Sequence, residues 1–123
     1  MEYESVQRGP GACPGAADDP AGPPYEAVSF QIISFAGTAK SCYLEAIEAA
    51  KAGDDPSSLI EQGDVAYRAA SEAHQRALVQ EVEGTLGCGL LLIHAETILI
   101  SAETIRGLLP TIVELAADTR AAG

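Results

Sequence analysis

The chain has 123 residues, of which 47% are hydrophobic and 5% are aromatic, and its formal net charge at pH 7 is -11. This length supports one domain, and the alanine-rich, aromatic-poor composition favours packed helices over a β-sandwich or a barrel. The negative charge argues against binding to nucleic acid or to an anionic lipid surface, and it would attract a basic protein partner instead.

The N-terminal segment, residues 1–24, has the composition of a disordered tail. It holds five of the seven prolines and four acidic residues. Such a stretch cannot bury enough apolar surface to offset the entropy that is lost on ordering. It also lacks a basic region followed by an apolar run, so we expect no signal peptide.

The three cysteines, Cys13, Cys42 and Cys88, are expected to be reduced thiols. Their number is odd, and no two of them have the spacing of a metal site or a redox pair. Unpaired cysteines are typical of proteins in a reducing compartment. The sequence therefore predicts a cytoplasmic protein.

Residues 25–120 predict three helices, at about 25–52, 56–84 and 90–119. In the first helix, apolar residues recur close to the helical period, at Val28, Ile32, Phe35, Ala39, Cys42, Ala46 and Ala49. Gly37 lies inside this helix at a cost of about 1 kcal/mol relative to alanine. That cost predicts either a close approach by another backbone or a kink.

The second helix has two possible starts. Asp55 can cap a helix whose first residue is Pro56, or Ser58 and Glu61 can form a capping box. The helix is expected to end near Gly84. Because the loop that follows is short, the second and third helices should be antiparallel neighbours.

The third helix is apolar on nearly all sides over residues 90–101 and amphipathic beyond them. Pro110 predicts a kink or a local break, and residues 120–123 are expected to fray. The apolar run is too short and too polar to span a membrane, but it is more apolar than one three-helix bundle needs. We therefore predict an all-α, antiparallel up-down-up bundle that buries part of this run against other copies of itself.

His94 is the strongest candidate for a functional residue because it lies within this apolar run. Its apolar neighbours favour the neutral imidazole that a nucleophile needs. The alternative is a buried structural histidine that is hydrogen-bonded to a backbone carbonyl. The other histidine, His74, is expected to pack in the bundle or to form a hydrogen bond between helices.

Three segments, in this order, resemble the lactose/cellobiose-specific enzyme IIA of the bacterial phosphoenolpyruvate-dependent sugar phosphotransferase system. They are the block SFQIISFAGTAKS at 29–41, the triplet Glu72-Ala73-His74, and the apolar run around His94. The resemblance implies trimers of three-helix bundles. It also implies that a histidine of the third helix accepts a phosphoryl group from the carrier HPr and passes it to a cysteine of the IIB component. The position that matches this histidine is His94.

Several positions around His94 differ from the family pattern. Thr97 stands where the family has an aspartate that holds a metal ion at the trimer axis, so we predict a trimer without metal or other cofactor. Glu96 replaces a glutamine, Ile98 a histidine and Thr38 an aspartate.

A phosphoryl group on His94 would carry a charge of about -2 and would need hydrogen-bond donors. The nearest on the same helix are Thr97, one turn away, and Ser101, two turns away. Glu96 lies about 200° around the helix from His94, so it could orient or repel the group only across a contact between copies. Three cationic side chains could also bind phosphate, but each is expected to be a solvated surface residue: Lys40, Arg68 and Arg76.

The sequence leaves two functions open. One is a phosphocarrier that takes a phosphoryl group from phospho-HPr on His94 and donates it to IIB. The other is a degenerate relative that keeps the trimeric scaffold as a regulatory or interaction protein. The replaced positions around His94 motivate this second reading.

Overall fold

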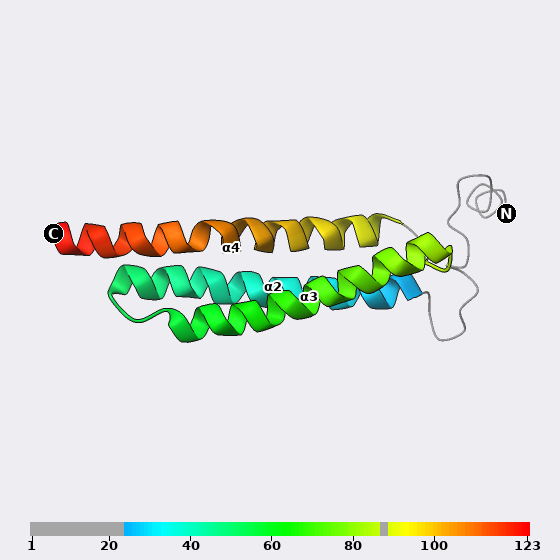
Figure 1. Ribbon diagram of the computed structural model, residues 1–123, viewed down its shortest axis with the longest axis horizontal. Coiled ribbons are helices and arrows are strands. Elements are labelled where there is room, and N and C mark those ends of the chain that lie inside the picture. The colour runs from blue at the N-terminus through cyan, green and yellow to red at the C-terminus, as the bar shows by residue number, and fades with distance from the viewer. Residues whose placement is uncertain (1–23, 87–88) are drawn as a thin grey trace.

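Residues 24–86 and 89–123 are described by the computed structural model of the protein, and they form three helices and no strand. The helices are α2 (Pro24–Ala52), α3 (Ser57–Glu83) and α4 (Leu90–Ala122). They run side by side and alternate in direction, which confirms the predicted all-α up-down-up bundle (Figure 1). Except for Pro24, the predicted N-terminal tail lies outside the described residues, as do Cys13 and Cys88.

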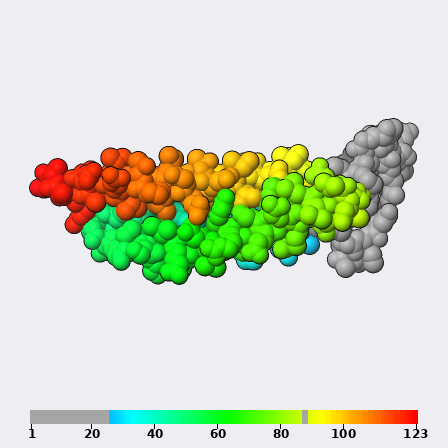
Figure 2. Space-filling view, viewed as in Figure 1, coloured from blue at the N-terminus to red at the C-terminus, as the bar shows by residue number. Residues whose placement is uncertain are grey.

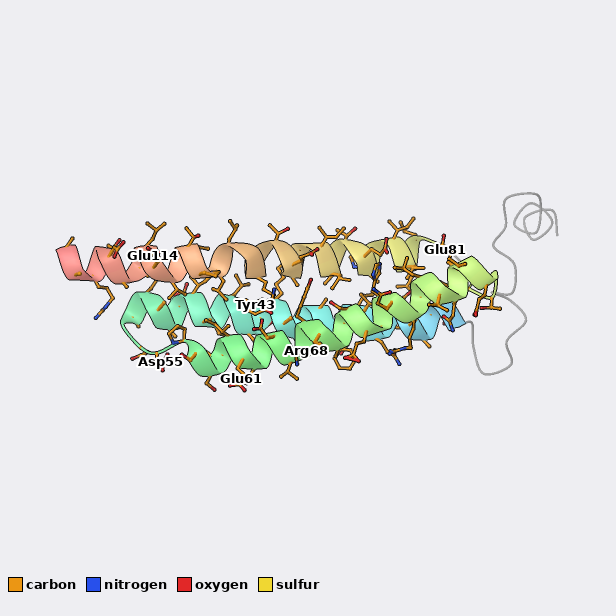
Figure 3. The ribbon with its side chains drawn as sticks, in the orientation of Figure 1. Tyr43, Asp55, Glu61, Arg68, Glu81 and Glu114 are labelled. Carbon is orange, nitrogen blue, oxygen red and sulfur yellow. The ribbon has the colours of Figure 1, made fainter. Side chains whose placement is uncertain are left out.

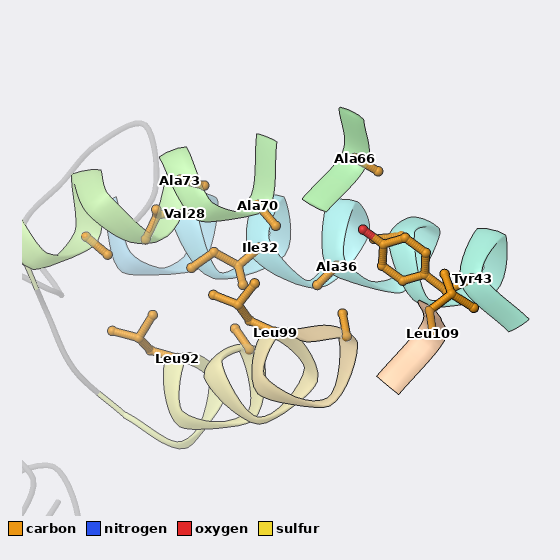
Figure 4. Close-up of a cluster of buried hydrophobic side chains, with 14 of the residues drawn as sticks. Val28, Ile32, Ala36, Tyr43, Ala66, Ala70, Ala73, Leu92, Leu99 and Leu109 are labelled. Atoms are coloured by element: carbon orange, nitrogen blue, oxygen red, sulfur yellow. The ribbon is translucent and has the colours of Figure 1, made fainter. Parts of the chain in front are cut away.

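Helix α2 is the centre of the bundle because it packs along both α3 and α4, whereas α3 and α4 contact each other at few positions. The buried residues of α3 are one glycine and four alanines, so α3 packs against α2 through small side chains. The buried side chains of α4 that face α2 include larger ones, and Ile32 of α2 lies close to Leu99 of α4 (Figure 4). The described helices form an elongated body, with α4 along one edge of the view (Figure 2).

Tyr43 connects the three helices at one point in the core. Its side chain is fully buried, and its hydroxyl donates a hydrogen bond to Asp64 Oδ1 at 2.6 Å. Arg106 Nε of α4 donates to the same oxygen at 3.0 Å, and its guanidinium lies 5.2 Å from the centre of the Tyr67 ring. One carboxylate therefore receives hydrogen bonds from both α2 and α4.

The electrostatics of this cluster follow from burial and hydrogen bonding. Burial, and then the hydrogen bond to Asp64, raise the pKa of Tyr43, so its hydroxyl stays a donor. The pKa of Asp64 is lowered, because the hydrogen bonds from Tyr43 and Arg106 and the charge of Arg106 outweigh the opposing effect of burial.

The helix ends refine the expectations from sequence. Helix α3 begins at Ser57, one residue after the predicted Pro56, and Pro56 is its N-cap, without a side-chain hydrogen bond. Asp55 still contributes at this end, because the Ser57 backbone N–H donates to Asp55 Oδ1 at 3.0 Å. Asp55 lies in the loop between α2 and α3 (Figure 3). The helix ends at Glu83, and Gly84 follows with a left-handed φ of 75°.

The C-terminal part of α4 differs from the prediction in two ways. The predicted local break at Pro110 is wrong, because the helix continues through this residue, and Leu109 beside it is buried in the core. The predicted fraying of residues 120–123 is also wrong, because the helix extends to Ala122. Arg120 Nη1 donates to the carbonyl oxygen of Lys51 at 3.2 Å, and so provides a partner for an acceptor at the end of α2.

The close approach predicted at Gly37 is not found in the described part of the chain. A Cβ built at Gly37 meets no described atom within 4 Å, and α2 is continuous there. The close approach occurs at Gly63 instead, where a Cβ would lie 2.5 Å from Cε1 of Tyr43. No described helix combines the length and hydropathy that are needed to cross a membrane.

Candidate functional site

Helix α4 presents His94 on its exposed side, near the start of the helix. The alternative of a buried structural histidine is therefore wrong for the single chain. Thr97 is also exposed, whereas Ser101 is half-buried. The imidazole of His94 is thus accessible from outside the bundle.

His74 and Glu96 form a hydrogen bond between α3 and α4. His74 Nε2 lies 2.5 Å from Glu96 Oε1, and the two side chains are 27% and 45% exposed. The prediction that His74 makes a hydrogen bond between helices is confirmed. The sequence did not identify Glu96 as its partner, because no local pattern indicates which residues of two antiparallel helices lie at the same height.

The pair determines how Glu96 lies relative to His94. Glu96 points toward α3, where it meets His74. His94 is two residues away on the same helix, about 200° around it, so it lies on the side away from α3. Within one chain, the carboxylate and the candidate nucleophile therefore face in nearly opposite directions.

An exposed apolar stripe separates these two sides of α4. Its members recur at spacings of three or four residues over the first turns of the helix, and all are exposed: Ile93, Thr97, Ile100, Thr104 and Leu108. The Thr97 hydroxyl donates to the carbonyl of Ile93 at 3.0 Å, and the Thr104 hydroxyl to that of Ile100 at 2.9 Å. Because both threonine hydroxyls already donate to the helix backbone, a surface that covers the stripe does not have to provide hydrogen-bond acceptors for them.

The bond to Ile93 also changes the role expected of Thr97. Its hydroxyl hydrogen is used by the helix backbone, so in this rotamer Thr97 does not donate to a group on His94. Ser101 is the remaining donor proposed from the sequence.

Two of the three cations considered for phosphate binding act elsewhere. Arg76 Nη2 donates to Gln31 Oε1 at 2.8 Å between α3 and α2. The charge of Arg68 contributes to lowering the pKa of Asp64. Lys40 is half-buried on α2.

A groove between α3 and α4 was not foreseen from the sequence. It has a volume of about 490 Å³ and begins some twelve residues, or roughly 18 Å, along α4 from His94. It is separate from the candidate site and is lined by Ile60, Asp64, Arg106, Leu109, Pro110, Val113 and Glu114.

Fold and site together define a small helical-bundle protein that carries one exposed histidine beside an apolar face of its last helix. Comparison with protein families agrees with this class. The family described as the lactose/cellobiose-specific IIA subunit of the PTS system matches residues 27–117. The match covers nearly all of the described helices, so the chain belongs to this family.

Individual relatives support the same assignment. The oligo-beta-mannoside-specific EIIA component of Bacillus subtilis is 32% identical over 93 residues, which are 73% of this chain and 84% of the relative. The lactose-specific EIIA component of Staphylococcus aureus is 31% identical over 90 residues, 71% of this chain and 87% of its own. The lichenan-specific enzyme IIA component of Bacillus subtilis is 34% identical over 93 residues, 73% of this chain and 84% of its own. No solved structure matches the chain.

Proposed function

We propose that this protein is a cytoplasmic phosphocarrier that takes a phosphoryl group from phospho-HPr on His94 and passes it to a cysteine of a IIB component. The observation that carries the proposal is the exposed imidazole of His94 on α4 of a IIA-family chain. A group that must meet two different protein partners has to be accessible from outside the bundle.

The reaction needs little from the protein besides positioning. A ring nitrogen of His94 attacks the phosphorus of phosphohistidine on HPr, the P–N bond to HPr breaks, and the HPr imidazole leaves. In the second step a cysteine thiolate of IIB attacks the same phosphorus, and the imidazole of His94 is the leaving group. No cofactor takes part in either step.

The assembly that we propose is a homotrimer in which α4 packs against α4 of the other copies. The exposed stripe of Ile93, Thr97, Ile100, Thr104 and Leu108 supports it, because such a surface on a single helix is more apolar than water contact favours. We further propose that the trimer axis holds no metal, because the ring at its centre would be made of Thr97.

The test is the intact mass of the protein after incubation with phosphoenolpyruvate, enzyme I and HPr, beside His94→Ala. We expect the wild-type chain to gain the mass of one phosphoryl group, which acid removes, and the variant to gain nothing. If HPr from the same organism becomes phosphorylated and the wild-type chain does not, the phosphocarrier is wrong. The trimeric regulatory or interaction protein then takes its place.

A further inference from the structure

The few contacts between α3 and α4 give weight to the polar ones. Among the described residues, two polar side-chain contacts join these helices: the Asp64–Arg106 ion pair and the His74–Glu96 hydrogen bond. Their members are ten residues apart on each helix, which places the two contacts about 15 Å from each other. The first belongs to the cluster around Tyr43, whereas the second lies at the height of His94.

Glu96 is the acidic residue of α4 that lies nearest to His94 along the helix. Across the proposed contact between copies, a phosphoryl group on His94 with a charge of about -2 would be repelled by a Glu96 carboxylate of the next copy that is free to move. The contact with His74 restricts this movement. It holds the carboxylate against α3 of its own chain.

We propose that His74 is a positioning residue for the phosphoryl site: it holds Glu96 against α3, so that a dianionic group can be carried on His94 of the neighbouring copy. The proposal rests on the phosphocarrier function and on the proposed packing of α4 between copies. It also accounts for a carboxylate at a position where the resemblance implies an uncharged glutamine, since the contact with His74 limits how far that carboxylate can move.

The first test measures the fraction of the protein that is phosphorylated at equilibrium with a fixed ratio of phospho-HPr to HPr. We expect His74→Ala to lower the ratio of phosphorylated to free protein about threefold at low ionic strength, and less at high salt, because the repulsion by Glu96 is screened. Adding Glu96→Gln to His74→Ala should restore the wild-type ratio, because the carboxylate that His74 holds in place is then absent.

Arg106→Ala is the matched control, since it breaks the other polar contact between the same helices. It should lower the melting temperature as a contact between α3 and α4 is lost, and leave the phosphorylated fraction unchanged. If His74→Ala does not fold, His74→Leu replaces it, because leucine can pack between the helices but cannot hydrogen-bond to Glu96. An unchanged fraction in the His74 variant, or a double variant as impaired as the single one, would overturn the proposal.

A second measurement separates this proposal from the phosphocarrier function. Phosphoramidate phosphorylates histidine directly: a ring nitrogen attacks phosphorus, the P–N bond breaks and ammonia leaves. Cleavage after Arg68, Arg76 and Arg106 places His74 and His94 on different tryptic peptides, so loading of His94 can be followed alone. If phospho-HPr transfers no phosphoryl group to this protein, the proposed phosphocarrier function is wrong. Slower loading of His94 in His74→Ala, with recovery in the double variant, would still support the role of His74, and equal loading rates would refute it.

Discussion

At the scale of single residues, the fold depends on one close contact and one shared carboxylate. Gly63 lets the ring of Tyr43 lie against the backbone of α3, and the Tyr43 hydroxyl then reaches Asp64. The sequence shows a glycine in a helix and a tyrosine in another, but nothing local indicates that they meet. The meeting depends on the relative height of α2 and α3, which only the packed structure determines.

Gly63→Ala should therefore destabilise the protein by about 1–3 kcal/mol, the usual cost of an added methyl group in a packed core. The new Cβ would lie 2.5 Å from the Tyr43 ring, so the ring or the helix must shift. Urea unfolding measures the effect. Gly107→Ala is the control, because its Cβ would meet nothing within 4 Å. It should stabilise α4 by up to about 1 kcal/mol, and equal effects of the two changes would contradict the contact.

Asp64 predicts a specific pH dependence of stability. Because its pKa is lowered in the folded protein, its contribution is complete above its ordinary value of 3.8 and is lost as the pH falls through the folded value. Asp64→Asn should thus be less stable than wild type at pH 7, and the difference should shrink below about pH 4. Urea unfolding from pH 7 to pH 3 tests this. A difference that stays constant over that range would show that the carboxylate charge contributes nothing.

At the scale of elements, apolar periodicity was enough to predict three helices, because each helix has a long stripe that must be buried. Their alternating directions followed from the short connections between them. The excess of apolar residues at the start of α4 was also visible, and the structure locates it in exposed residues such as Ile93 and Ile100. Contacts between elements were harder to predict. The sequence did not predict the hydrogen bond of Arg120, because its acceptor, the Lys51 carbonyl, lies on a different helix.

The exposed stripe of α4 predicts how a single charge should affect assembly. Ile100 is 58% exposed in the single chain, so Ile100→Glu should leave the helix content unchanged while it places three like charges at the proposed trimer centre. Sedimentation should then show a monomer for this variant and a trimer for the wild type. Val79→Glu makes the same change at a position of α3 that is 55% exposed, and it should remain trimeric. A trimeric Ile100→Glu would place the contact between copies elsewhere.

At the scale of the whole molecule, the separation of two sides of α4 is the feature that matters most for function. His94 faces away from α3, Glu96 faces α3, and the apolar stripe lies between them. If copies pack around that stripe with rotational symmetry, the His94 side of one copy meets the Glu96 side of the next. The sequence could suggest such a meeting from helical angles alone, but it could not show that the Glu96 carboxylate is already paired with His74.

The same geometry predicts how the assembly responds to metal ions. In a trimer around the stripe, Thr97 forms a ring at the axis, and because threonine carries no charge, the ring offers no anionic ligand. A chelator should therefore leave the sedimentation and the melting temperature of the wild type unchanged. Thr97→Asp would place three carboxylates at the axis, whose mutual repulsion a divalent cation can relieve. This variant should assemble more weakly in chelator and recover when a divalent cation is added, with metal bound at one ion per trimer. If Thr97→Asp binds no metal, residue 97 does not lie at the axis, and the packing of α4 between copies must differ from the one proposed.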